Sequence, residues 1–132
     1  MPVIQISLYE GRSSEEKMGI CRSIQNSIKD SLSITHDNFI HRIFEFDDSS
    51  MLVPPGKSRN YIIIELNLLP GRDQALKLQL FKKIEENLLK FKISANDILI
   101  IYREPSLENW YIEGETAKQR LANTLCRVRP DL

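Results

Sequence analysis

The sequence has little cysteine, no excess charge of either sign and no long apolar run. Its 132 residues include two cysteines, and 18 basic side chains balance 18 acidic ones. A net charge of zero disfavours general binding to nucleic acid or to an anionic membrane surface, because both require a basic excess. No apolar run approaches the length that spans a bilayer. Hydrophobic residues still make up 42% of the chain, so we expect one compact cytoplasmic domain over residues 1–132.

Metal and cofactor motifs are also missing. Cys21 and Cys126 lie far apart and match no metal-ligand spacing, and the N-terminus lacks the basic and apolar stretches of a signal peptide. We therefore expect two reduced thiols. His36 and His41 have no partners at metal-ligand spacing, so we expect turn and strand-surface roles for them. No phosphate loop or dinucleotide fingerprint is present, and we expect neither a cofactor nor a metal.

An internal repeat organises the chain. Gly11-Arg12 recurs as Gly71-Arg72, 60 residues later, and residues 34–38 resemble residues 93–97, 59 residues later. Each half has an apolar run, a glycine turn, a long segment of helical period, a polar turn and a second apolar run. The sequence therefore predicts two β-α-β units, at residues 2–46 and 61–104. A turn-rich connector (47–60) separates them as a possible flap, and a basic tail (105–132) follows as a solvated or subunit-contacting segment.

The helices show clear start signals. Ser13 and Glu16 form a capping box, and Asp73 is the expected N-cap of the second helix. The first helix is predicted over about residues 14–31. The expected buried stripes are Met18, Cys21, Ile24, Ile28 and Leu32 in the first helix and Leu78, Phe81, Ile84, Leu88 and Phe91 in the second. The predicted strands span residues 3–8, 39–46, 61–69 and 97–103, and we expect the last to be covered on both faces.

The predicted fold class is α/β (α+β), with a four-stranded sheet and both helices on one face. Right-handed crossovers and a pseudo-twofold between the units lead to this arrangement. The other face is then uncovered. Isoleucines dominate the central strands, and burying each is worth roughly 1.5–3 kcal/mol, so we expect a closed homo-oligomer. The isoleucines concerned are Ile62, Ile63, Ile64, Ile98, Ile100 and Ile101.

Three segments resemble the tautomerase superfamily, within it the malonate semialdehyde decarboxylase-like (4-oxalocrotonate tautomerase-like) branch. They are residues 2–12 (PVIQISLYEGR), 69–72 (LPGR) and 109–112 (NWYI). The resemblance covers residues 2 to about 117 and implies a tautomerase/MIF-like fold, a homotrimer, and a small carboxylate-bearing substrate.

The resemblance also implies specific roles for residues. The N-terminal proline of the family, freed by removal of the initiator methionine, is the catalytic group, and here it corresponds to Pro2. Arg72 matches an arginine that holds the substrate carboxylate, and its planar guanidinium suits that task. Trp110 is either a pocket wall or ordinary packing. A family carboxylate aligns with Asn38, although the adjacent Asp37 would supply it after a one-residue shift.

The expected activity is cofactor-independent keto-enol tautomerisation, with Pro2 as general acid/base and Arg72 as carboxylate binder. The family's decarboxylases carry a second arginine where this chain has Pro70. Two alternatives therefore stay open. One is a decarboxylase or hydratase of a 3-oxo acid acting at the same site. The other is a non-catalytic trimeric scaffold or binding protein.

Overall fold

The computed structural model describes residues 1–128, with side chains up to residue 125. The expected reduced thiol at Cys126 lies outside the described side chains, whereas Cys21 is a half-buried free thiol. The first repeat forms β1 (Val3–Tyr9), α1 (Ser14–Leu32) and β2 (Ile40–Phe46), and the second forms β3 (Ile62–Asn67), α2 (Gln74–Leu88) and β4 (Ile98–Arg103). Among the described residues, no helix combines the length and apolarity needed to cross a bilayer.

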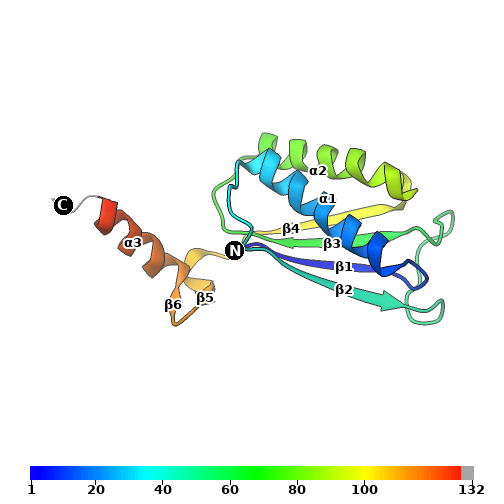
Figure 1. Cartoon of the computed structure of the whole chain (residues 1–132), viewed down its shortest axis with the longest axis horizontal. Helices are drawn as coiled ribbons and strands as arrows, with labels where there is room; N and C mark the ends of the chain where they lie inside the picture. The colour runs from blue at the N-terminus through cyan, green and yellow to red at the C-terminus, as the bar shows by residue number, and fades with distance from the viewer. Residues whose placement is uncertain (129–132) are drawn as a thin grey trace.

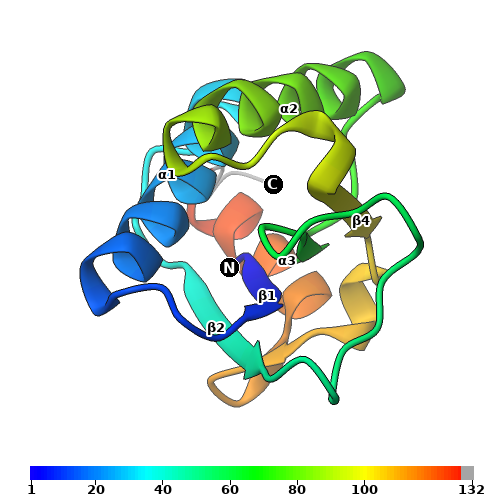
Figure 2. The same cartoon turned by 90° about the vertical axis from the view of Figure 1, so that its right-hand side faces the viewer.

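The predicted topology is confirmed. The sheet has the order β2-β1-β3-β4, with parallel pairs inside each repeat and an antiparallel pair, β1 and β3, at the junction. Figures 1 and 2 show α1 and α2 side by side on one face of this sheet, with the other face uncovered. Because β1 and β3 run in opposite directions, the start of β1 lies beside the end of β3.

The helix starts follow from the capping residues. Ser13 Oγ accepts from the Glu16 amide at 3.1 Å, and Asp73 Oδ1 accepts from the Leu76 amide at 2.9 Å, as an N-cap side chain should. The reciprocal half of the predicted capping box is wrong, because the Glu16 carboxylate pairs instead with Arg12.

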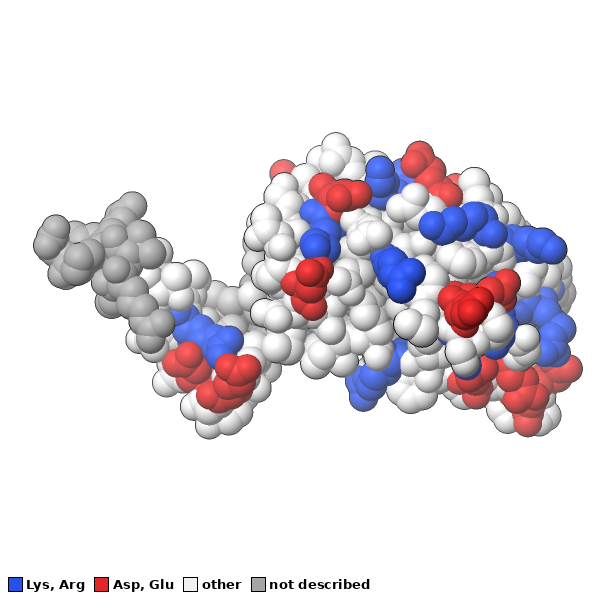
Figure 3. Space-filling model, in the orientation of Figure 1, with Lys and Arg blue, Asp and Glu red and all other residues white. Residues whose placement is uncertain are grey.

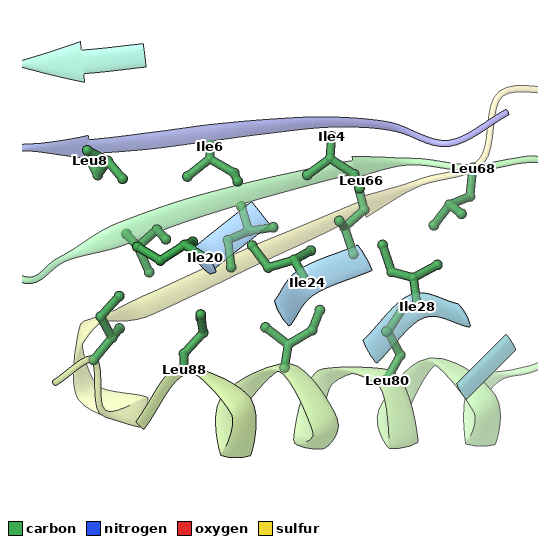
Figure 4. Close-up of a cluster of buried hydrophobic side chains, with 14 of the residues drawn as sticks. Ile4, Ile6, Leu8, Ile20, Ile24, Ile28, Leu66, Leu68, Leu80 and Leu88 are labelled. Carbon is green, nitrogen blue, oxygen red and sulfur yellow. The ribbon is translucent and has the colours of Figure 1, made fainter. Parts of the chain in front are cut away.

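The core lies between the sheet and the two helices. Side chains alternate along each strand, so every second residue of β1 and β3 points to the helices (Figure 4). Asn87 of α2 donates to Ser27 Oγ of α1 at 2.8 Å, which gives the helix pair one buried polar contact. The fully buried aliphatic side chains are Ile4, Ile6, Ile20, Ile24, Ile28, Ile62, Ile64, Leu66, Leu68, Leu80, Ile84 and Leu88.

The predicted helix stripes are confirmed in part, because Ile24, Ile28, Leu32, Ile84 and Leu88 are buried, whereas the first residue of each stripe is exposed. Met18 and Leu78 occupy equivalent positions in the two repeats and are 60% and 56% exposed. The buried columns instead begin at Ile20 and Leu80 and continue at intervals of four residues. Two adjacent apolar columns both fit helical spacing, so the sequence alone did not distinguish them.

The strand β4 and the open face also differ from expectation. Ile62, Ile64, Ile98 and Ile100 point to the helices, and only Ile63 and Ile101 of the six expected isoleucines belong to the open face. No residue of β4 is fully buried, so its predicted coverage on both faces is wrong within this chain. The open face carries other exposed apolar side chains, namely Ile40, Phe44 and Leu99.

The last part of the chain is an ordered arm. A short turn at Leu107–Asn109 leads to the hairpin β5 (Tyr111–Ile112) and β6 (Glu115–Thr116), and α3 (Ala117–Val128) follows directly. Figure 1 shows this arm extending from the sheet at the end where the chain begins. The tail, predicted as a solvated or subunit-contacting segment, therefore has regular structure up to residue 128 and lies next to the N-terminus.

Candidate functional site

A pocket of about 560 Å³ lies where the N-terminus, the β3-α2 turn and the arm meet. Met1 and Arg72 line it, and Pro2 is buried directly behind Met1 at the start of β1. Antiparallel pairing of β1 and β3 brings these two chain segments together. The complete lining is Met1, His36, Asn38, Leu69, Pro70, Gly71, Arg72, Leu107, Ile112, Ala117, Arg120, Leu121 and Thr124.

Pro2 and Arg72 are held by backbone contacts. The Pro2 carbonyl accepts from the Ile40 amide at 3.0 Å, which ties the start of β1 to β2. Arg72 follows Gly71, whose φ of +124° places the turn in a region that favours glycine. The Arg72 guanidinium donates to the Leu69 carbonyl at 2.8 Å, so it folds back over its own turn toward the pocket.

Arg72 is not neutralised by a carboxylate. No Asp or Glu oxygen among residues 1–128 lies within ion-pair distance of it. The nearby carboxylate Glu104 pairs instead with Lys77. An arginine retains its positive charge in proteins and offers five N–H donors, so Arg72 keeps donors for an anionic ligand.

The charges of the pocket act on the chain terminus. Burial is the largest cause that lowers the pKa of the Met1 amino group, followed by the positive charges of Arg72 and Arg120. Both effects disfavour an ammonium ion. An amine at this end of β1 therefore loses its proton more readily than an exposed terminus.

The other predicted residues divide into two groups. Asn38 lines the pocket, and its backbone N–H donates to His36 Nδ1 at 3.2 Å. Asp37 does not line it, because its exposed carboxylate accepts from Lys29 at 2.5 Å. Trp110 does not line it either, and its indole N–H donates to the Pro105 carbonyl at 3.0 Å.

A second pocket marks the pseudosymmetric position at the opposite end of the sheet. It contains Gly11 and Arg12, the counterparts of Gly71 and Arg72. Gly11 has a φ of +122°, almost the same as its counterpart. Arg12 is engaged, however: its guanidinium donates to the Phe91 carbonyl and to Asn60 Oδ1, both at 3.1 Å. The two ends therefore share a turn but differ in the availability of its arginine.

Sequence reasoning missed the contribution of the arm. The connector at residues 47–60, considered as a possible flap, contributes none of the residues that line the pocket. The arm provides six instead, Leu107, Ile112, Ala117, Arg120, Leu121 and Thr124. The available signal was the 117, 120, 121 and 124 spacing, which places these residues on one helix face. His36, expected to be a turn residue, also lines the pocket.

A profile of the tautomerase enzyme family matches residues 37–113, more than half of the chain. The chain belongs to this family. The matched region of this tautomerase-family chain includes Asn38, Arg72 and Trp110 and ends before α3, so Arg120 lies outside it.

Solved structures share the fold of this tautomerase-family chain. One is FG41 malonate semialdehyde decarboxylase inhibited by 3-bromopropiolate, with a TM-score of 0.80, 21% identity, and coverage of 92% of this chain and 96% of that one. A second malonate semialdehyde decarboxylase, studied for its decarboxylase and hydratase activities, has a TM-score of 0.81 and 15% identity, and the match covers 92% of this chain and 98% of that one. A fused 4-OT in the form of an asymmetric trimer has a TM-score of 0.79 and 17% identity, and the match covers 89% of this chain and 98% of that one.

Proposed function

We propose that this protein is a cofactor-independent tautomerase acting on a small keto or enol compound that carries a carboxylate. In this proposal Pro2, freed by removal of Met1, is the general acid/base, and Arg72 binds the substrate carboxylate. The observation that carries the proposal is the placement of the β1 terminus beside an arginine that no carboxylate of residues 1–128 neutralises.

The environment supports Pro2 as a base near neutral pH. Without Met1, its nitrogen becomes a secondary amine on a rigid ring at a strand start. The burial and the two arginine charges that lower the pKa of the Met1 amino group would act on this nitrogen as well. A general base is most effective when its pKa lies close to the working pH.

The proposed step moves one proton and needs no added reactant. Arg72 holds the carboxylate so that the enol hydroxyl of the substrate lies next to Pro2. The Pro2 nitrogen takes the hydroxyl proton while the carbonyl forms, and the protonated nitrogen then delivers a proton to the adjacent carbon. Arg72 also stabilises negative charge that develops on the substrate oxygens.

The decarboxylase or hydratase alternative has a specific observation in its favour, the likeness of fold to malonate semialdehyde decarboxylases. The pocket composition favours tautomerisation over it. Asn38 lines the pocket where the alternative needs a carboxylate, and Asp37 is paired with Lys29 outside it.

We also propose that the protein is a homotrimer in which three sheets face inward. Fused 4-OT structures of the same fold are described as trimers. In this chain the uncovered sheet face carries exposed Ile40, Phe44 and Leu99, and burying apolar surface of this kind favours association.

The test is turnover of phenylpyruvate and of 2-hydroxymuconate by protein whose intact mass shows that Met1 is absent. We expect Pro2→Ala to lower kcat by about 10²–10⁴-fold, the range for loss of a general acid/base. Arg72→Gln should raise KM, because it removes the charge that binds the substrate carboxylate. Undiminished activity in Pro2→Ala would refute the proposal.

The scaffold alternative has its own discriminating measurement. If Met1 remains in place, the Pro2 nitrogen is an amide and has no basicity. N-terminal mass spectrometry of protein from its native cell should show a free proline, and a Met-Pro terminus there would support the scaffold instead.

A further inference from the structure

The second pocket, at the sheet end away from the arm, has a volume of about 380 Å³. Three chain segments form it: the turn between β1 and α1, the end of the connector, and the turn that follows α2. Figure 3 shows both basic and acidic side chains on the surface at this end. The charged residues of the lining are four basic ones, Arg12, Arg59, Lys90 and Lys92, and two acidic ones, Glu10 and Glu16. The lining therefore carries an excess of positive charge.

Arg12 is a fixed positive charge in this pocket. Its side chain is only 13% exposed, and its guanidinium donates to the Phe91 carbonyl and to Asn60 Oδ1. The Phe91 ring packs against Gly19 of α1, where an added Cβ would lie 3.0 Å from the ring. Carbonyl and amide oxygens accept these hydrogen bonds without removing the charge. The carboxylate within ion-pair distance, Glu16, is half-exposed at 3.5 Å and compensates the charge only in part.

Aromatic rings hold two further cations at the pocket. The Lys90 ammonium lies 5.4 Å from the centroid of the Phe91 ring, and the Arg59 guanidinium lies 5.3 Å from that of Tyr9. An aromatic face attracts a cation but does not neutralise it. Arg59 is also paired with Asp48, which compensates its charge. Lys90 has no carboxylate within ion-pair distance among the side chains described, up to residue 125.

Lys92 adds a second ammonium from the same turn. Its backbone has a φ of +62°, in the left-handed region where glycine is the usual residue after a helix. Its amide donates to the Leu89 carbonyl at 3.0 Å, which closes the turn. The exposed side chain of Lys92 likewise lies beyond ion-pair distance of every described carboxylate. Two ammonium groups that no carboxylate neutralises therefore line one cavity together with the fixed charge of Arg12.

We propose that this second pocket is a binding site for a small phosphate-bearing compound, held by Lys90 and Lys92. A phosphate group carries close to two negative charges and has several acceptor oxygens, so it can contact two ammonium groups at once. Arg12 attracts the same group from its fixed position and keeps its hydrogen bonds to the chain. Neither Met1 nor Pro2 lines this pocket, so the inference does not depend on the proposed function.

The first experiment titrates pyrophosphate into the protein calorimetrically at constant ionic strength. We expect binding, and Lys90→Gln/Lys92→Gln should weaken it roughly tenfold or more, because two charge-assisted contacts are lost. Glycerol 3-phosphate is the second probe. Binding of either probe supports the proposal, and the tighter of the two shows whether the site takes an inorganic anion or a phosphate ester. Succinate should bind more weakly than both, and equal binding of succinate would contradict the assignment to phosphate.

The matched control is Lys82→Gln/Lys118→Gln. It removes the same number of charges from exposed positions on α2 and α3 that do not line the second pocket, and it should bind pyrophosphate as the wild type does. An equal loss of affinity in this control would show that binding reflects only the net charge of the protein, and would overturn the proposal. Lys90→Arg/Lys92→Arg keeps both charges and should retain most of the affinity.

Thermal unfolding gives a second readout. A ligand that binds only the folded protein raises Tm as its concentration rises, so pyrophosphate should raise the Tm of the wild type more than that of Lys90→Gln/Lys92→Gln. The unfolding curve without ligand shows whether this variant is folded. The proposal is overturned if neither phosphate probe binds the wild type, or if the folded variant keeps wild-type affinity. Pro2→Ala should bind pyrophosphate normally, so this result is independent of the proposed chemistry.

Discussion

Arg12 and Arg72 occupy equivalent turns, and their surroundings give them different roles. Arg12 is mostly buried and donates to the Phe91 carbonyl and to Asn60, which joins the end of β1 to the second repeat. Among the described residues, the only hydrogen bond of the Arg72 side chain lies within its own turn. The same residue type is therefore a structural brace at one end of the sheet and a candidate ligand-binding group at the other.

We predict opposite consequences for the two glutamine substitutions. Arg12→Gln should lower the free energy of unfolding by about 1–3 kcal/mol, because it leaves a half-buried carbonyl without its charged donor. Arg72→Gln should change stability little and weaken carboxylate binding instead. Urea denaturation and ligand titration of both variants provide the comparison. A large stability loss in Arg72→Gln alone would reverse our assignment.

The pH profile of the enzyme is a second prediction at this scale. The proposed base acts when deprotonated, so kcat/KM should rise with pH, and the burial and Arg72 charge that lower the pKa of the Met1 amino group should lower the pKa of this rise as well. Arg72→Gln removes a nearby positive charge and should therefore shift this pKa upward. Lys118→Gln should leave it in place. An unshifted profile in Arg72→Gln would show that the titrating group is not at the β1 terminus.

At the scale of elements, the repeat carried most of the predictable information. The four strands, the two helices of the repeats and both N-caps followed from local signals that occur twice, because alternation and capping depend on neighbouring residues. The arm did not follow, since β5 and β6 are two residues long and have no detectable period. Its part in the pocket depends on tertiary placement, and with it Arg120 was missed. The roles of Pro2 and Arg72 were predicted only through a family resemblance.

The connector, considered as a possible flap, is fastened at its C-terminal part. The buried carboxylate of Asp97 accepts from the Ser58 hydroxyl at 2.5 Å and from the Ser58 amide at 3.0 Å. These hydrogen bonds lower the pKa of Asp97 below its ordinary 3.8. The connector is thus attached to the turn before β4, at the sheet end away from the candidate site.

This attachment predicts a pH-dependent stability. Asp97→Asn should cost about 1–3 kcal/mol near neutral pH, because a hydrogen bond to a charged group is lost. The Asp97 carboxylate contributes fully to stability at pH values above its pKa in the unfolded chain. This stabilisation is lost as the pH falls through the lower pKa of the folded state. The difference in the free energy of unfolding between wild type and Asp97→Asn should therefore become smaller in acid. Urea denaturation measures it, with exposed Asp30→Asn as control, and a constant difference would contradict the prediction.

At the scale of the whole molecule, we expect subunits to associate through the open sheet face and not through the helix face. The open face has exposed apolar residues interspersed with charges, including an ion pair of 2.9 Å between Arg103 and Glu65. The helix surface on the other side also exposes single apolar residues such as Leu78. Only the sheet face is expected to be covered in the proposed homotrimer.

Sedimentation tests this distinction. Wild-type protein should show about three times the chain mass of 15.3 kDa. Phe44→Glu should yield monomers, because the carboxylate would lose its hydration inside the interface. Leu78→Glu makes the same kind of change on the outer surface of α2 and should remain trimeric. A trimer that survives Phe44→Glu but not Leu78→Glu would place the interface on the helices.

The paired turns at opposite ends of the sheet have a consequence for how this protein can change over generations. If each β-α-β unit were a separate copy of one short chain, both turns of the sheet would be encoded by the same codon. One altered codon would then change both ends together. Here each unit has its own codons, so a substitution at one turn leaves the other untouched. One end can then acquire a structural role while the other keeps the proposed catalytic one. The contrast between Arg12 and Arg72 is the division of labour that such independence permits.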